Sequence, residues 1–296
     1  METVLVLPVL LGLLAAVFFA ASNILVRAGI TDSSPILALL YSLTANVVVL
    51  WPLVVWLYDF QVDLWAWRYF IVAGTLAPVL GRFFNYSGID KLGINLSTPI
   101  TYTNPLVTIV LATVFLGQRL LPLGYVGAVV IFAGSVLLGT TRGESGVRTF
   151  KKRHLIFPIL ASLFYGGSHI FREVGIELVS SPALAAAVTA STSWFWMVLY
   201  LVVTRHRHDF AITRREQIFF TLSGVATATA IPILYTALQV GDVVIVAPMS
   251  NMTPFWLLLL SFVFFRGSEL FTPRVIGGTL LTVVGVILIS TFGTVS

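Results

Sequence analysis

Arginine, histidine and glutamate side chains inside long apolar runs are the groups in this sequence best able to do chemistry. Arg82 lies in one such run, and His169, Arg172 and Glu173 lie together in another. A charged side chain in apolar surroundings costs about 3 kcal/mol unless it is paired, so each of these groups needs a purpose. The planar guanidinium of Arg82 can clamp a carboxylate or phosphate through two parallel hydrogen bonds. We predict that Arg82 binds an anionic ligand; the alternatives are snorkelling to a polar boundary and an internal ion pair.

The second group combines two titratable side chains at helical spacing. His169 and Glu173 are four residues apart, so both project from one face of a helix. Because both side chains can exchange protons, a proton-coupling site is one hypothesis. The alternative is a structural ion pair in which Arg172 or Arg27 binds Glu173. For His169 itself we expect a place on the wall of a ligand cavity.

Neutral hydrogen-bonding side chains in the apolar runs are further candidates for ligand contact. They are Asn23, Tyr86, Thr101, Tyr102, Tyr235 and Asn251. Some side chains of this kind only bond between helices, each contributing about 0.6 kcal/mol. Two proline pairs stand near them, Pro99 with Pro105 and Pro248 with Pro254. Since proline removes a backbone hydrogen bond, we expect these segments to serve in gating or ligand contact, with a plain packing kink as the alternative.

Several kinds of chemistry are missing from the sequence. There is no cysteine, and the H-E-x-x-H, Walker A and G-x-S-x-G motifs are absent. His206 and His208 lie in a basic loop, and two loop histidines are a weak metal signal. We therefore predict no enzyme activity, no cofactor and no metal site.

The composition requires that the elements carrying these residues face lipid. Of 296 residues, 58% are hydrophobic and only 10% are charged, whereas a soluble domain has about 25% charged residues. A bilayer core of about 30 Å needs about 20 apolar helical residues. We predict an all-α membrane protein with ten transmembrane helices, at residues 4–26, 35–57, 67–88, 93–115, 123–139, 155–176, 182–203, 218–238, 243–265 and 275–292.

The two halves of the chain repeat one another. Residues 19–30 (FAASNILVRAGI) match 165–176 (YGGSHIFREVGI), and residues 85–105 match 234–254 with both proline pairs in register. We predict one five-helix repeat at 1–140, a basic linker at 141–154 and a second five-helix repeat at 155–296. Because five is odd, the second repeat must enter the membrane from the opposite side, so the repeats are inverted.

The basic residues predict which loops face the cytoplasm. Of the 17 Lys and Arg, three lie inside or near the ends of spans, two lie on one side and twelve on the other. By the positive-inside rule the side with twelve is cytoplasmic, including loops 140–154 and 204–217, and both termini are outside. Basic loops beside anionic lipid account for the net charge of +5. We therefore expect the bilayer and a small-molecule substrate as partners, and not nucleic acid.

Glycines recur at a spacing of seven residues in the last helix of each repeat. They are Gly127 with Gly134, and Gly278 with Gly285. Seven residues are about two helical turns, so each pair makes one smooth face that another helix can approach closely. We expect either close helix packing or the seam of a homodimer at these faces.

These features together resemble the EamA-type members of the drug/metabolite transporter superfamily. The resemblance is carried by 19–30 and its echo, by 85–105 (NYSGIDKLGINLSTPITYTNP) and 234–254 (LYTALQVGDVVIVAPMSNMTP), and by the glycine-spaced closing helices. It implies alternating access, and a central cavity lined by the first, third and fourth helices of each repeat. It also implies termini in the cytoplasm, which differs from the charge count.

From the residues and the resemblance we predict a secondary active transporter in the cell membrane. It would export a small polar or amphipathic metabolite, amino-acid-like or otherwise, driven by a gradient or by exchange because no ATP-binding motif is present. A passive channel on the same scaffold is the alternative, although passive passage does not need the titratable His169 and Glu173. A membrane enzyme or sensor would need a polar catalytic motif in a loop, and the loops contain none.

Overall fold

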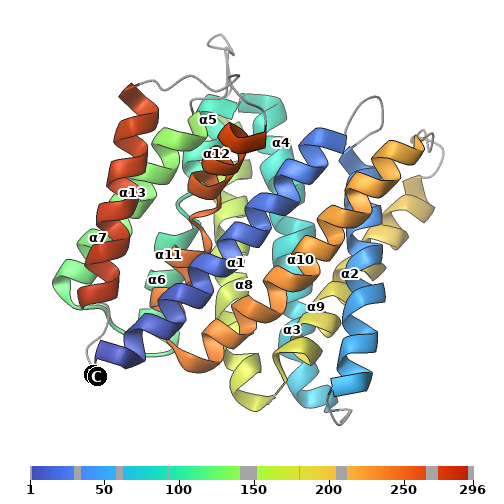
Figure 1. Ribbon diagram of the computed structural model, residues 1–296, viewed down its shortest axis with the longest axis horizontal. Coiled ribbons are helices and arrows are strands. Elements are labelled where there is room, and N and C mark those ends of the chain that lie inside the picture. The colour runs from blue at the N-terminus through green and yellow to red at the C-terminus, as the bar shows by residue number, and fades with distance from the viewer. Residues whose placement is uncertain are drawn as a thin grey trace.

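The computed structural model describes residues 2–29, 35–57, 63–92, 94–140, 152–179, 181–204, 212–264 and 273–292. Every regular element in these ranges is a helix (Figure 1). Residues 141–151 of the predicted linker and 205–211 of the second basic loop lie outside the described residues.

The first repeat folds into seven α-helices and one turn of π-helix. These are α1 (Glu2–Gly29), α2 (Pro35–Leu57), α3 (Leu64–Thr75), the π-helical turn η1 (Leu76–Gly81), α4 (Arg82–Leu92), α5 (Ile94–Thr101), α6 (Asn104–Phe115) and α7 (Pro122–Thr140). Asp63 begins α3, where its Oδ1 accepts hydrogen bonds from the backbone N–H groups of Trp65 and Ala66 at 2.9 and 3.3 Å. Proline begins α2 and α7, because the first turn of a helix does not need its N–H.

The second repeat follows the same order with longer continuous helices. It comprises the short 3₁₀-helix η2 (Lys152–Leu155), α8 (Ile156–Leu178), α9 (Pro182–Thr204), α10 (Arg214–Val240), α11 (Val243–Ser250), α12 (Thr253–Phe264) and α13 (Pro273–Phe292). Thr213 and Glu216 form a capping box that begins α10. Glu216 Oε2 accepts from the Thr213 N–H at 2.8 Å, and the Glu216 N–H donates to Thr213 Oγ1 at 3.3 Å.

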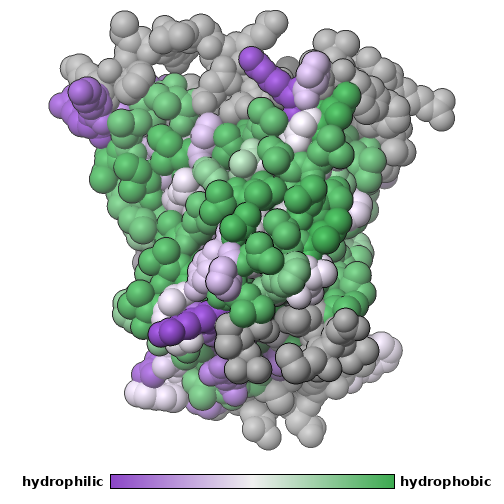
Figure 2. All heavy atoms as spheres, turned by 90° about the vertical axis from the view of Figure 1, so that its left-hand side faces the viewer, coloured by the Kyte–Doolittle hydropathy of each residue, from purple (hydrophilic) through white to green (hydrophobic). Residues whose placement is uncertain are grey.

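The helices have the lengths and composition that a bilayer requires. Eight helical stretches in the described residues are long and apolar enough to cross a membrane, and Pro99–Phe115 and Pro122–Leu138 are shorter apolar helices. Together they match the ten predicted spans, so the prediction of a polytopic helical protein is confirmed. Figure 2 shows an apolar surface over the α7 and α13 side of the molecule, with hydrophilic side chains towards its two ends.

Equivalent helices of the two repeats run in opposite directions along α10. The end of α1 lies at the beginning of α10, where Arg215 Nη2 donates to the carbonyl of Ala28 at 3.5 Å. The end of α8 lies at the end of α10, where Gln239 Nε2 donates to the carbonyl of Val179 at 3.3 Å. Since α1 and α8 are the first long helices of their repeats, the repeats are inverted as predicted (Figure 1).

The repeats pack into one another rather than side by side. The most extensive helix pairs are α1 with α10, α7 with α13, and α2 with α9 and α10. Each pair joins the first repeat to the second. Between α1 and α10, the hydroxyls of Ser22 and Ser223 are 2.7 Å apart. The large shared interface means that a movement of one repeat must shift its contacts with the other.

The predicted glycine faces meet each other inside the chain. A Cβ atom on Gly134 would lie 2.8 Å from the carbonyl oxygen of Gly278, and one on Gly127 would lie 2.9 Å from that of Gly285. Of the two interpretations, close helix packing and a homodimer seam, the structure shows close helix packing at these faces. These glycine faces are occupied within one chain, so a homodimer would have to use other faces of α7 and α13.

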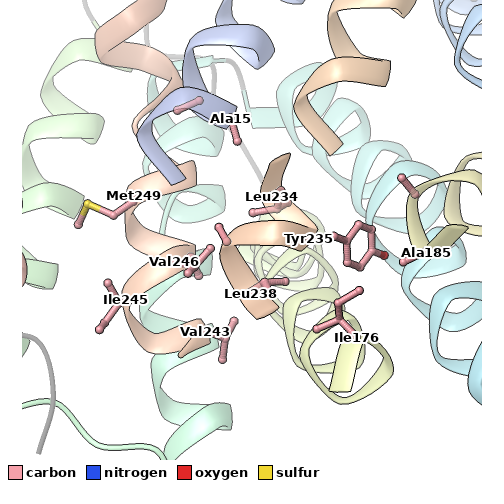
Figure 3. Close-up of a cluster of buried hydrophobic side chains, with 14 of the residues drawn as sticks. Ala15, Ile176, Ala185, Leu234, Tyr235, Leu238, Val243, Ile245, Val246 and Met249 are labelled. Atoms are coloured by element: carbon pink, nitrogen blue, oxygen red, sulfur yellow. The ribbon is translucent and has the colours of Figure 1, made fainter. Parts of the chain in front are cut away.

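Among the described residues, those at one end of the molecule are more deeply buried than those at the other. The region where α8 and α10 end and α9 and α11 begin is called the packed end. Figure 3 shows its core, with Ile176, Ala185, Tyr235, Leu238 and Val246 close together. All eight residues of α11 are buried there. We call the opposite end, where α8 and α10 begin, the basic end, because the described residues Arg27, Lys91, Lys152, Arg153, Arg214, Arg215 and Arg274 belong to the helix ends located there.

Candidate functional site

A cavity of about 360 Å³ lies between the two repeats. Its walls include residues of α1, α4, α5, α8, α10 and α12, which belong to the first, third and fourth spans of each repeat. The second span of each repeat also contributes, in contrast to the lining that the family resemblance implied. Those additional lining residues are Ser42, Leu43 and Asn46 on α2, and Thr189, Ala190 and Ser193 on α9.

Most of the predicted ligand-contact residues meet at this cavity. The lining includes Asn23, Arg82, Thr101, Tyr102, His169, Arg172 and Asn251. They come from both repeats and are up to 228 positions apart in the sequence, from Asn23 to Asn251. The repeats thus bring together polar groups that a single helix could not.

Two predicted contact residues lie elsewhere. Tyr86 on α4 is 54% exposed and is not part of the lining. Tyr235 is fully buried at the packed end, where its ring meets Phe70 edge to face at 5.5 Å. Tyr86 and Tyr235 match in the sequence repeat, but their different burial shows that the shared residue type does not give them a shared role.

Arg82 reaches the cavity directly after the π-helical turn η1. Pro78 lies in that turn and also lines the cavity. A π-helical turn accommodates an inserted residue and changes the direction of the side chains that follow it. Tyr165 of α8 lies against this segment, since a Cβ atom on Gly81 would be 2.7 Å from its ring. The Tyr165 hydroxyl is within electrostatic range of Arg82. The first cationic subsite is therefore Arg82 next to a phenol.

A chain of hydrogen-bonded hydroxyl groups fixes the position of Arg172. The Tyr235 hydroxyl bonds to Arg172 and lies 2.6 Å from Thr189 Oγ1, which donates to the carbonyl of Ala185 at 2.8 Å. Because arginine can only donate, the Tyr235 hydroxyl accepts from Arg172 and donates its own O–H to Thr189 Oγ1. Tyr235 is thus a positioning residue for the second cationic subsite, although it does not line the cavity.

The cavity wall carries positive charge without negative charge. Arg82 and Arg172 both line it, and among the described lining residues there is no aspartate or glutamate. Four buried atoms of the described lining residues also have no hydrogen-bond partner: Asn46 Oδ1, Asn104 Oδ1, His169 Nδ1 and Arg172 Nε. Buried polar groups are nearly always paired in folded proteins. The wall is therefore suited to a polar ligand with negative charge.

Glu173 does not join the cavity, and neither predicted ion pair is formed. Its Oε1 accepts from Gln118 Nε2 at 2.9 Å, while Gln118 Oε1 accepts from the Val244 N–H at 3.4 Å. Glu173 instead lines a separate pocket at the packed end. The spacing of four residues places His169 and Glu173 on one side of α8 but in different cavities, so the structure does not bring them together as one titratable site.

The predicted pair of Arg27 with Glu173 is excluded by the inverted arrangement. Arg27 lies in the last turn of α1, beside the beginning of α10, whereas Glu173 lies near the end of α10. The 27 residues of α10 span about 40 Å. The inverted repeats predicted from the sequence already imply opposite boundaries for these two residues, which end the first helix of each repeat.

The first proline pair flanks a break in a transmembrane helix. α5 and α6 are separated at residues 102–103, between Pro99 and Pro105. Pro105 has no N–H for the carbonyl of Thr101, and Asn104 Nδ2 donates to that oxygen at 3.1 Å instead. Backbone carbonyls inside a membrane need such partners. Asn104, next to the proline, therefore satisfies the carbonyl group that the break leaves without its helical donor.

The second proline pair flanks an equivalent break, at residues 251–252 between α11 and α12. Pro254 leaves the carbonyl of Ser250 without its helical donor, and Thr253 Oγ1 donates to it at 3.2 Å. Pro254 lines the cavity, whereas Pro99, Pro105 and Pro248 are not among its lining residues. Both breaks place irregular backbone beside the cavity, where it can contact a ligand.

The cavity is closed towards the packed end. Residues 183–190 of α9 are all buried, whereas the equivalent stretch of α2, residues 36–43, is only partly buried. Among the lining residues, Asn23 is exposed, and it lies in the half of α1 nearer the basic end. In the described part of the chain, the way into the cavity is therefore from the basic end.

Some lining residues were not among the predicted ones. Asn46 and Asn85 are lone amides in apolar or mixed helices, and Thr189 with Ser193 repeats a hydroxyl at a spacing of four. The amides could have been selected as costly polar groups at membrane depth. The hydroxyls could not, because Thr and Ser also bond to their own helix, as Thr189 does.

A cavity between inverted repeats, flanked by broken helices, is an arrangement found in membrane transporters. The EamA-like transporter family matches the chain twice, over residues 6–140 and 152–291, and the chain belongs to this family. An uncharacterized transporter of Archaeoglobus fulgidus is 20% identical over 286 residues, covering 96% of this chain and 98% of the relative. A solved crystal structure has the same fold, with 16% identity and a TM-score of 0.77 over 95% of this chain and 97% of that one.

Proposed function

We propose that this protein is a secondary active transporter that exports a small polar metabolite by alternating access. The observation that carries the proposal is the unequal packing of the two repeats around one cavity. The second repeat closes the packed end with α9 and α11, in which residues 183–190 and 243–250 are all buried, while the residues of α2 that match 183–190, residues 36–43, are only partly buried at the basic end. Because the repeats are inverted, each repeat can adopt the packing that the other has here. That change closes the basic end and opens the packed end.

The basic end is the cytoplasmic end in this proposal. The positive-inside rule places loops rich in Lys and Arg in the cytoplasm. The described basic residues gather at that end, whereas the packed end has the acidic Asp63, Glu177 and Asp242 with Arg68 and Arg119. The structure then corresponds to a cytoplasm-facing state, in which an exporter receives its substrate. Export as the direction rests on the family resemblance.

Counterflow in proteoliposomes tests the transport mechanism. A thermal-shift screen of the purified protein against metabolites first identifies a ligand, and labelled ligand is then presented outside vesicles loaded with unlabelled ligand. A carrier gives transient accumulation, because its cavity opens to one side at a time. A channel gives simple equilibration, and that result would refute the proposal.

Arg82→Ala tests whether the transport passes through the central cavity. We expect loss of counterflow with an unchanged elution volume in size exclusion, because Arg82 supplies a cationic donor to the ligand. Arg119→Ala is the matched control, since Arg119 is exposed in the loop between α6 and α7. Full activity of the Arg82 variant would remove this residue from the binding site.

A further inference from the structure

The two cationic subsites of the cavity come from different repeats, and the fold requires neither of them. Arg82 belongs to the first repeat and Arg172 to the second. Their repeat equivalents are the apolar residues Ile231 and Val26. An equivalent helix therefore folds without a charge at each position. A purpose other than folding is needed for two arginines on one cavity wall.

The charge of this wall is not balanced by the protein. In the described residues no carboxylate lies within ion-pair distance of Arg82 or Arg172. Glu173, the acid next to Arg172 in the sequence, is bound to Gln118 and faces another pocket, and Asp90, the acid nearest to Arg82 along the chain, pairs with Lys91 at 3.9 Å. A cation inside a membrane protein is costly without an opposite charge or water. The unbalanced charge on the wall is two, and a ligand with two negative charges would balance it.

We propose that the transported substrate is an organic dianion with two separated anionic groups, such as a dicarboxylate, bound at one end by Arg82 and at the other by Arg172. This inference rests on the proposed transport function and names its substrate class. Tyr165, which contacts the Arg82 subsite, and Arg172 are seven residues apart on α8, a separation of about 10 Å along the helix. The two subsites are therefore anchored two turns apart along α8.

The groups between the subsites fit the middle of such a substrate. His169 is one turn from Tyr165 on α8, and the amides of Asn46 and Asn104 line the same cavity with unpaired oxygen atoms. These groups can bond to hydroxyl or keto groups on a short carbon chain. An ammonium group would instead lie between two guanidinium groups with no carboxylate to balance it, so the site disfavours amino acids relative to dicarboxylates of the same length.

Binding by residues of both repeats also couples recognition to the transport cycle. Arg82 follows the π-helical turn of the first repeat, and Arg172 is fixed to the packed end through Tyr235 and Thr189. A dianion that contacts both arginines draws the two repeats together around it. A monoanion contacts only one of them and leaves the other arginine without a counter-ion.

The test compares dicarboxylates with their monoamides, which have the same shape and one charge less. Thermal unfolding of the purified protein is measured against succinate, glutarate and adipate, against succinamate and glutaramate, and against glutamate. We expect the preferred dicarboxylate to bind at least about tenfold more tightly than its monoamide, as expected for loss of a charged hydrogen-bonded contact. Arg82→Gln and Arg172→Gln should each reduce this ratio to about one, and Arg119→Gln should leave it unchanged.

Variants that keep the charge separate recognition from folding. Arg82→Lys and Arg172→Lys should retain the preference for the dicarboxylate with weaker binding, because lysine keeps the charge and loses the planar fork. Equal binding of dicarboxylate and monoamide, tighter binding of glutamate, or no binding of any of the three dicarboxylates would each overturn the inference.

Counterflow separates this inference from the transport function. If the wild-type protein exchanges a monoanion or an amino acid but no dicarboxylate, the carrier mechanism is supported and the proposed substrate class is overturned. A dicarboxylate that binds with the expected preference but equilibrates without counterflow would support the recognition and refute the carrier mechanism.

Discussion

Unpaired polar atoms define the cavity at the scale of single residues. Asn46 is 1% exposed, Asn104 5% and His169 7%, and each has a side-chain atom without a partner. Leaving a buried polar atom unpaired costs about 1–3 kcal/mol. Three such atoms on one wall therefore need polar partners in the cavity, which water or a ligand can supply. A polar ligand that bonds to them recovers this free energy, which is how a membrane-embedded site can bind a water-soluble molecule.

His169 is the titratable side chain whose coupling role can be tested directly. His169→Asn copies Asn23, its equivalent in the first repeat. We expect this change to alter the dependence of the transport rate on pH, because asparagine cannot exchange a proton. The charged group facing it is Arg172, with Tyr102 and Tyr165 on the same cavity wall. The measurement is the initial uptake rate in proteoliposomes at several pH values.

The matched control for this change is His154→Asn, because His154 lies at the basic end in η2 and does not line the cavity. Its pH profile should follow that of the wild-type protein. If the His169 variant also keeps the wild-type profile, His169 has no part in proton coupling and serves only as a wall of the cavity.

Asp242 is expected to make the packed end less stable as pH rises. Burial raises the pKa of Asp242 above its ordinary value of 3.8. The folded protein then holds the proton more tightly than the unfolded chain, so the free energy of unfolding falls as pH rises from 3.8 through the raised pKa. Glu173 and Glu177 line the same pocket.

We therefore expect Asp242→Asn to unfold at a higher temperature than the wild-type protein at about pH 7, and at the same temperature below about pH 3.5. Asparagine also begins helices well, so the start of α11 is retained. Thermal unfolding in detergent across this pH range is the measurement, with the exposed Glu177→Gln as a comparison. A stabilisation that is equal at both pH values would show that ionisation of Asp242 is not its cause.

Sequence reasoning identified most of the cavity wall but not how its members interact. The high cost of a charge in lipid singled out Arg82, His169 and Arg172 without any structure, and all three line the cavity. Glu173 was grouped with them because it lies one turn away, but Gln118, 55 positions distant in the chain, binds it. Spacing along one helix fixes which face a residue takes, whereas its partner depends on helices whose rotation the sequence does not encode locally.

Helix breaks are the main feature at the scale of elements. The proline pairs predict that backbone hydrogen bonding is interrupted in the fourth span of each repeat. The helix breaks lie between the prolines, at residues 102–103 and 251–252. The π-helical turn before Arg82 was not predicted, although Pro78 was visible inside the third span. A single proline is compatible with a kink, a π-helical turn or a continuous helix, and Pro232 inside continuous α10 shows the last of these.

Close approach of α7 and α13 makes one glycine much less replaceable than its neighbour. A Cβ atom on Gly134 would meet Thr282 Oγ1 and lie 2.8 Å from the carbonyl oxygen of Gly278, whereas one on Gly277 would find only Leu137 Cδ2 at 3.6 Å. We expect Gly134→Ala to lower the free energy of unfolding by about 1–3 kcal/mol, because backbone atoms cannot yield to the added methyl group.

Gly277→Ala is the matched control, and it should be neutral or slightly stabilising because alanine favours helix by up to about 1 kcal/mol over glycine. Thermal unfolding of both variants in the same detergent compares them. Equal behaviour of the two variants would mean that α7 and α13 are not in close contact in the folded protein.

At the scale of the whole molecule, the function depends on the repeats being upside down relative to each other. Leu64 begins α3 and Arg214 begins α10, which are the starts of the third span in the first and second repeats. Both residues are exposed, Leu64 by 71%. In a parallel repeat these two positions would lie on one side of the membrane. In the inverted arrangement they lie on opposite sides, and the positive-inside rule places Arg214 in the cytoplasm.

The chain has no cysteine, so a single introduced cysteine reports its own location without background. We expect Leu64→Cys in intact cells to react with a membrane-impermeant maleimide, and Arg214→Cys to react only after the membrane is opened. Ala185→Cys, at a fully buried position, should resist labelling in both conditions. Labelling of both exposed positions from the same side would refute the inverted repeat. If instead Arg214→Cys is labelled in intact cells and Leu64→Cys only after the membrane is opened, the basic end faces outward. The structure then represents the state that releases an exported substrate rather than the state that receives it.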